Sequence, residues 1–344
     1  MKRLAVGLLA AQLVLITGCA HDVEGRGQPS SVAGDPGFFF DGPVPTYGQR
    51  VDALDTVRLA YLRALRRVDV CGLVGQPSLA KIGEIQSLGT LFAFDECDVE
   101  VKSPGRMFAR FISATVELAT ADGPEVARVD GVAVRESFAG SCEYLVPLDL
   151  AAQPGAGALS GPEQPYLRIG VIAETDCAGV PRVAQMIAEN MANSPLPVRD
   201  GLAAYTTLLA ERDPCAVLSV VDVGYWNISG TTPYRCEFGV AGNAADPEPV
   251  PMQVALRPRV VDVSIDGREV IRAEGVQVYL DRQRCSALVF AGPLLQRRLG
   301  NGSLVDTGDD LQIRPAIEVT SGEADCTGQT LAAGVAARAA AVYG

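Results

Sequence analysis

Eight of the nine cysteines fall into two sets of four with similar neighbours, and this pattern restricts the fold more than any other feature. The two sets are Cys71, Cys97, Cys142 and Cys177, followed by Cys215, Cys236, Cys285 and Cys326. In each set the first cysteine ends a helix-like stretch, the second lies in a strand-like stretch, the third opens a strand and the fourth precedes a helix. The sequence therefore predicts one four-cysteine unit that is used twice.

Each unit is predicted to contain a helix, several antiparallel strands and a second helix. Apolar residues at helical spacing indicate the first helix over residues 54–68 in one unit and 198–209 in the other. The first of these helices is crowded with arginines, which we expect to form a solvated outer face: Arg58, Arg63, Arg66 and Arg67. Asp130-Gly131 and Asp266-Gly267 favour type I′ hairpin turns, because both turn residues need positive φ.

The predicted fold class is α+β, with two tandem units at residues 48–194 and 195–344. In each unit a twisted antiparallel sheet carries an N-terminal and a C-terminal helix on one face, together with two disulfides. Residues 193–197 contain two prolines, which suit a short, stiff joint between the units.

The amino end predicts export. Lys2 and Arg3 precede an apolar run over residues 4–16, which has the length of a secretory signal and is too short to span a bilayer. The string that ends at Cys19 resembles the bacterial lipobox. It implies a signal peptide over residues 1–18 and a lipid anchor at Cys19, with two or more acyl chains (palmitate among them) for stable attachment. We therefore expect a protein tied to the extracytoplasmic face of the cell membrane.

Residues 19–47 are rich in Gly, Pro and Ser and are expected to form a flexible tether. Phe38, Phe39 and Phe40 interrupt this segment, and we expect them to dock on the first unit rather than to touch lipid.

Outside the cytosol an even number of thiols indicates disulfides, and the chain has no C-x-x-C pair of the kind that metal or redox sites use. Pairing along the chain is favoured, Cys71 with Cys97, Cys142 with Cys177, Cys215 with Cys236 and Cys285 with Cys326. A link between the first and fourth cysteines of each unit remains open.

The residues around Cys215, Arg212-Asp213-Pro214-Cys215-Ala216-Val217-Leu218, resemble the Asp-Pro-Cys opening of uncharacterised actinobacterial lipoproteins. The late cysteine before a terminal helix also resembles the extracytoplasmic sensor domains of mycobacterial receptor Ser/Thr kinases. The resemblance implies a compact α+β unit with two disulfides and a ligand groove, and it brings no established chemistry. The first unit has Val70 in place of the proline, so its membership depends on the internal repeat.

Several enzyme classes are disfavoured. The single histidine is His21 in the predicted tether, which argues against Ser-His-Asp and Cys-His nucleophile systems and against zinc sites that use histidine. Asp306-Thr307-Gly308 resembles the catalytic string of aspartic proteases, but no second copy supplies the partner aspartate, so a solvated turn is favoured. We expect no cofactor and no metal, and a net charge of −12 argues against nucleic acid. The lone tryptophan, Trp226, is expected to pack in the second core rather than line a pocket.

The sequence favours a non-catalytic binding module that captures a small molecule, a lipid or a cell-wall fragment, or that docks on another envelope protein. Its site is expected between sheet and helix or in the cleft between the two units. The alternative is a carboxylate-dependent hydrolase acting on cell-envelope material, which predicts two acidic residues close together in a cleft with raised pKa values. A structural envelope protein with cationic partners is the third hypothesis.

Overall fold

The computed structural model describes residues 37–102, 110–171, 177, 179–199, 207–242, 248–295, 312–322, 326 and 328–344. Within these residues the strands of the first unit are β1 (Glu84–Gly89), β2 (Glu96–Lys102), β3 (Arg110–Ala119), β4 (Glu125–Val129), β5 (Val132–Glu136), β6 (Tyr144–Pro147) and β7 (Gln164–Val171). Those of the second are β8 (Val223–Thr232), β9 (Arg235–Val240), β10 (Val250–Val260), β11 (Glu269–Ala273), β12 (Val276–Asp281), β13 (Ser286–Phe290) and β14 (Ile313–Ser321).

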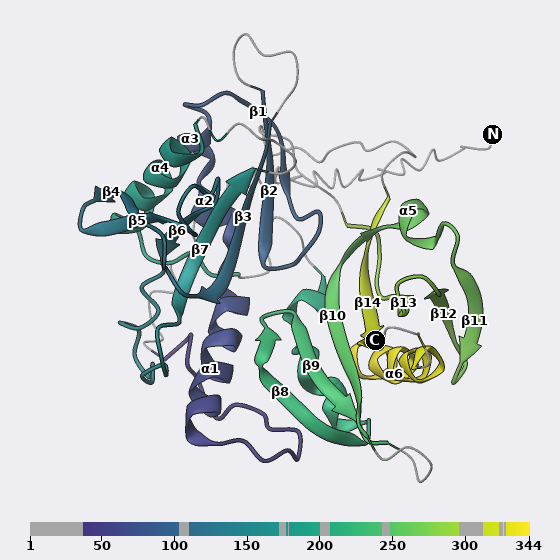
Figure 1. Ribbon diagram of the computed structural model, residues 1–344. Helices are drawn as coiled ribbons and strands as arrows, with labels where there is room; N and C mark the ends of the chain where they lie inside the picture. Colours follow the sequence, from purple (N-terminus) through teal and green to yellow (C-terminus); the bar gives the residue numbers. More distant parts are fainter. Residues whose placement is uncertain are drawn as a thin grey trace, which may run out of the picture.

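The two units share one topology. The first sheet has the strand order β1-β2-β3-β7-β6-β5-β4, and the second has the order β8-β9-β10-β14-β13-β12-β11 when it is followed from β8. Each strand of the first sheet therefore corresponds to the strand numbered seven higher in the second, as β1 does to β8. Neighbouring strands are antiparallel in both sheets (Figure 1). The predicted α+β fold with two tandem units is confirmed.

Helices cover one face of each sheet and enclose the two main cores. The helical segments are α1 (Ala53–Arg67), α2 (Val70–Val74), α3 (Gln76–Leu79), α4 (Val180–Ala192), α5 (Val261–Ile265), α6 (Gln329–Tyr343) and the 3₁₀ turns η1 (Leu208–Glu211) and η2 (Pro214–Ser219). In the first unit α2 and α4 pack on the sheet, and η2 and α6 do so in the second. Alternation along β2 sends Cys97, Val99 and Val101 into the first core and leaves Glu96 on the opposite, open face.

The four disulfides follow the predicted sequential pairing, and the first-with-fourth pairing is wrong. Each unit has one bond from its second helical segment to its second strand, Cys71–Cys97 between α2 and β2 and Cys215–Cys236 between η2 and β9. The other two bonds, Cys142–Cys177 and Cys285–Cys326, connect the start of β6 and of β13 to the residues just before α4 and α6. Each bond thus fastens a covering helix to its own sheet.

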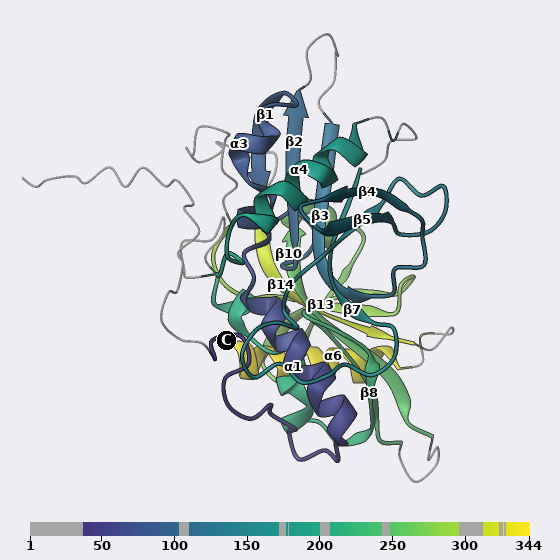
Figure 2. The same ribbon diagram turned by 90° about the vertical axis from the view of Figure 1, so that its left-hand side faces the viewer.

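The prediction that the arginines of α1 form a solvated outer face is wrong. Arg66 Nη2 lies 3.0 Å from Asp213 Oδ2, and Arg58 Nε donates to the Ile228 carbonyl at 3.2 Å. Both partners belong to the second unit. They are within reach because α1 lies between β3 of the first unit and β8 of the second (Figure 2). Leu59 and Leu62 of α1 form a small core cluster with Ile228. The first helix therefore joins the two units.

The prediction of a helix over residues 198–209 is also wrong for residues 198–199 and 207–209, which are the ones that the structure describes. Val198 instead pairs with Val68 in an isolated antiparallel bridge, and residues 208–211 form a single 3₁₀ turn. Asp213 precedes Pro214 and is extended, with φ −81° and ψ 119°, since proline excludes the helical conformation from the residue before it. Residues 200–206 lie outside the described residues.

One of the two predicted hairpin turns is correct. Asp130 and Gly131 join β4 to β5 with φ of +48° and +89°, as a type I′ turn requires. In the second unit the corresponding turn is Glu274-Gly275, with φ of +48° and +84°. Asp266-Gly267 instead follows α5, where a glycine with positive φ ends the helical turn.

Residues 37–47, which the sequence assigned to the tether, pack against α1. Phe39 belongs to the first core, the Phe40 ring meets Tyr61 at 5.0 Å, and Arg67 lies 5.0 Å from the centre of the Phe38 ring. The prediction that these phenylalanines dock on the first unit is confirmed. Among the residues that the structure describes, every helix is too short or too polar to cross a membrane.

A candidate ligand cleft between the two units

The junction of the two units encloses a cavity of about 310 Å³, called the inter-unit cleft below. The first unit lines it with residues of α1, β3 and the turn before β2, namely Arg58, Leu62, Ala93, Asp95, Thr115, Glu117 and Leu118. The second unit lines it from β8, β9, the turn between them and β10 with Thr231, Thr232, Pro233, Tyr234, Arg235, Ala255, Leu256 and Arg257. A cleft between the units is one of the two places where the sequence predicted a site.

Equivalent strand positions of the two units face this cleft. Cys97 pairs with Ala114, and its counterpart Cys236 pairs with Val254. Matching these pairs makes Thr115 equivalent to Ala255 and Glu117 equivalent to Arg257. Those four residues all line the cleft, so the duplicated topology produces a cavity with two related walls.

The ion pair on the open face of each sheet carries exchanged charges. Arg168 donates to Glu117 from Nε at 2.9 Å and from Nη2 at 2.7 Å. Arg168 pairs with Thr115 across the sheet, as Glu318 pairs with Ala255, so Arg257–Glu318 is the same ion pair with the charges reversed. Because of this exchange, the first unit contributes an acidic side chain where the second contributes a basic one.

Burial raises the pKa of two acidic residues in the cleft. It raises the pKa of Asp95 to about 7, and the nearby Arg199 guanidinium opposes this effect. Burial also raises the pKa of Glu117, against the opposing charge and hydrogen bonds of Arg168. Asp95 therefore changes its charge near neutral pH, where its protonated form can donate a hydrogen bond.

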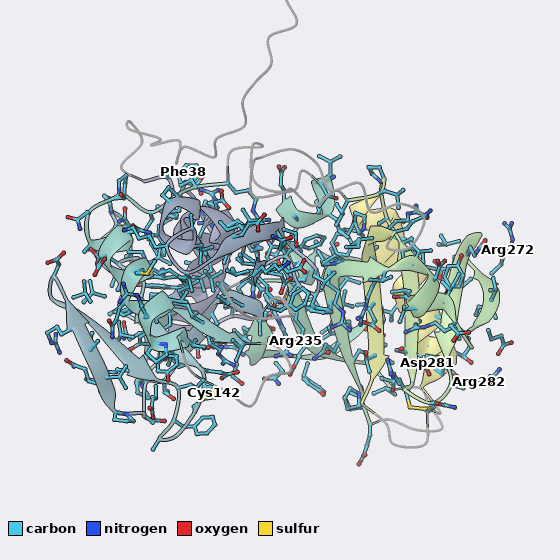
Figure 3. All side chains as sticks on the ribbon, turned by 90° about the horizontal axis from the view of Figure 1, so that it is seen from above. Phe38, Cys142, Arg235, Arg272, Asp281 and Arg282 are labelled. Atoms are coloured by element: carbon cyan, nitrogen blue, oxygen red, sulfur yellow. A yellow bond between two sulfur atoms is a disulfide. The ribbon has the colours of Figure 1, made fainter. Side chains whose placement is uncertain are left out.

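Of the arginines that line the cleft, Arg58 and Arg257 are held by close carboxylate contacts, whereas Arg235 has only long polar contacts. In Figure 3 it lies at the junction of the two units. Its Nε is buried and 3.5 Å from Glu237 Oε1, without a hydrogen-bond partner among the described residues, and its Nη2 contacts the Gly230 carbonyl at 3.5 Å. Arg58 is different, because Glu163 and two carbonyls of β8 occupy its guanidinium. A ligand with a negative or accepting group would therefore meet Arg235.

The turn between β1 and β2 holds Asp95 in place. Phe94 is fully buried in the second core, where its ring meets Tyr234 at 5.5 Å. Arg199 donates to the Phe94 carbonyl at 2.8 Å and to the Tyr234 hydroxyl at 2.8 Å. This anchor places Ala93 and Asp95, the two neighbours of Phe94, at the wall of the cleft.

A second cavity of about 360 Å³, called the outer cavity below, lies on the open face of the first sheet. It is lined by Phe92, Glu96, Ser113, Thr115, Glu143, Arg168, Gly170 and Val171. Ser113 donates a hydrogen bond to Glu96, and burial raises the pKa of Glu96. Thr115 belongs to both cavities, which are therefore neighbours.

The sequence did not single out Asp95, Thr115 or Arg235. A signal for the last did exist, because polar residues alternate around the second cysteine of each unit, at Glu96 and Asp98 and again at Arg235 and Glu237. Cys19, His21 and Asp306-Thr307-Gly308 lie outside the described residues. Within the described part of the chain, no three His, Cys, Asp or Glu side chains are grouped as metal ligands. Trp226 packs against the second core, as predicted.

The fold and the cleft define an α+β protein of two units, each with two internal disulfides, and a ligand-sized cavity where the units meet. No family model, curated protein or solved structure matches the chain.

Proposed function

We propose that the protein is a lipid-anchored extracytoplasmic module that binds a ligand in the inter-unit cleft without converting it. The observation that carries this proposal is the cavity of about 310 Å³ bounded by both units and lined by Arg235, whose contacts to Glu237 and to the Gly230 carbonyl are 3.5 Å long. Ligand sites commonly form at such junctions, with a mostly apolar lining and a few placed polar groups. Leu62, Ala93 and Leu118 supply apolar wall here.

The experiment for the cleft is native mass spectrometry of the protein purified from the envelope of the cell that makes it. Wild type and Arg272→Ala are expected to carry the same additional mass, and Arg235→Ala is expected to lose it. Arg272 is a matched control because it is exposed on β11, far from the cleft (Figure 3). A bound mass that survives in all three proteins, or that none of them carries, would contradict the proposal.

The anchor belongs to the same proposal and is supported by the string that ends at Cys19. Four disulfides suit the oxidising surroundings outside the cytosol. Labelling with a palmitate analogue should mark the wild-type protein in the membrane fraction, whereas Cys19→Ser should be unlabelled. Equal labelling of both proteins would reject Cys19 as the anchor.

The hydrolase is a second candidate, which the raised pKa values of Asp95 and Glu117 in one cleft favour. Against it, two donors of Arg168 hold Glu117, which leaves Asp95 without a second available carboxyl group in the cleft. If purified protein cleaves envelope material and Asp95→Asn abolishes that turnover, the hydrolase replaces the binding module.

A further inference from the structure

We propose, on the basis of the proposed function, that the ligand is a short extended peptide with free ends. Its ammonium group would lie in the outer cavity and its carboxylate in the inter-unit cleft. The proposal depends on three observations. The two cavities are neighbours, the side chains available at their far ends carry opposite charges, and the strand that forms their floor is hydrogen-bonded on both sides.

The two cavities lie next to each other along the open face of β3, and together they are called the groove below. Ser113 lines the outer cavity, Glu117 lines the cleft and Thr115 lines both. Arg168 lines the outer cavity while its guanidinium binds Glu117, so this ion pair crosses from one cavity to the other. The four residue-to-residue steps of strand from Ser113 to Glu117 cover about 13 Å. An extended peptide of about four residues has this length.

The charges that remain available differ at the two ends of the groove. Glu117, Arg58 and Arg257 are already paired with Arg168, Glu163 and Glu318. The outer end then presents Glu96, held in position by Ser113, and Glu143, whose contact to Arg168 is 3.4 Å long. The inner end presents Arg235, whose ion pair with Glu237 is 3.5 Å long, beside Asp95, whose protonated carboxyl group can donate a hydrogen bond. An ammonium group suits the outer end, and a carboxylate suits the guanidinium at the inner end.

The floor of the groove excludes recognition by strand addition. β3 is hydrogen-bonded to β2 on one side and to β7 on the other, so its backbone groups are occupied. Side chains must therefore recognise the ligand, through the hydroxyls of Ser113 and Thr115 and through Phe92 at the rim. Phe92 is 45% exposed, and Gly170 lines the outer cavity without a side chain.

Isothermal titration calorimetry of the mature full chain with tetra-alanine tests this inference, beside its N-acetylated and C-amidated forms and a neutral glucan tetrasaccharide. We expect the free peptide to bind and each blocking group to weaken binding by about tenfold or more. Arg235→Ala should weaken binding of the free peptide equally and remove its sensitivity to amidation. Glu96→Gln should do the same for acetylation, and Arg272→Ala should behave as wild type.

Equal affinity for free and blocked peptides, binding of the glucan alone, or no binding of any probe would overturn the peptide inference. The proposed function has a separate readout in native mass spectrometry. If native mass spectrometry finds a retained mass that depends on Arg235 and calorimetry finds no peptide binding, the cleft binds another class of ligand. Circular dichroism of each variant shows whether a lost affinity reflects a lost fold.

Discussion

At the scale of single residues, Phe94 connects the units most directly. It belongs to the first unit by sequence and to the second core by packing, where none of its surface is exposed. Its neighbour Phe92 lies at the rim of the outer cavity and is 45% exposed. The same residue type two positions apart therefore serves as a core residue and as a surface residue.

Phe94→Ala should reduce the free energy of unfolding by about 3–5 kcal/mol, because it removes a buried ring and leaves a cavity in the second core. Phe92→Ala is the matched control and should change stability by no more than about 0.5 kcal/mol. Urea denaturation of the two variants checks this. Similar losses for both would show that Phe94 does not anchor the turn.

Asp95 should make stability depend on pH. Its pKa rises from the ordinary 3.8 to about 7 in the folded state, so the folded chain holds a proton that the unfolded chain releases. Stability from this residue is complete below about pH 4 and is lost as the pH rises toward 7. The free energy of unfolding of Asp95→Asn, compared with that of wild type, should therefore be higher at pH 8 than at pH 4, by on the order of 2–4 kcal/mol. Parallel pH profiles of unfolding for variant and wild type would refute this.

At the scale of elements, α1 acts as a connector rather than as a surface helix. Its Arg66 reaches both the Asp213 carboxylate and, at 3.1 Å, the carbonyl of Pro233. The exposed pair Arg282–Glu269 of the second unit offers a comparison, because it joins the turn after β12 to the start of β11 in solvent. A double-mutant cycle should give a coupling energy of about 1–3 kcal/mol for Arg66–Asp213 and below about 1 kcal/mol for Arg282–Glu269. A smaller coupling energy for Arg66–Asp213 than for Arg282–Glu269 would show that α1 does not hold the two units together through this ion pair.

The disulfides are the second element-scale feature, since each ties a covering helix to a strand. Cys71–Cys97 closes a loop with a sequence separation of 26 residues. On the chain-entropy model, replacing both cysteines by serine should lower the free energy of unfolding by about 3–4 kcal/mol. Thermal denaturation of the double variant checks the size of the effect, and peptide mapping of the unreduced wild type should find this pair linked.

At the scale of the whole molecule, the two units share too many contacts to behave independently. They share α1, the buried Phe94, the bridge between Val68 and Val198, and Arg199 between Phe94 and Tyr234. We expect a single cooperative unfolding transition. Trp226 is the lone tryptophan and packs against both the second core and the α1 cluster, so its fluorescence reports the junction. Fluorescence and far-ultraviolet circular dichroism should therefore change at the same denaturant concentration, and an earlier fluorescence transition would show that the units separate first.

The sequence alone determined the local features of this protein and its repeat. Eight cysteines in two equivalent sets, period-two alternation around Cys97 and Cys236, and the Asp130-Gly131 turn each depend on residues close together in the chain, so their patterns are visible without a structure. The sequence did not predict the turn at Glu274-Gly275, because Asp-Gly is the stronger local signal for a hairpin. Asp266-Gly267 instead follows the helical turn α5.

Only the tertiary structure decided how the units meet. The arginines of α1 have the sequence pattern of a solvated face, yet their partners Asp213 and Ile228 lie far along the chain. Asp95 and Arg235 come together because two copies of one topology place equivalent strands around a shared cavity. The relative placement of two folded units depends on long-range packing, and neither hydrophobic period nor turn chemistry carries that information.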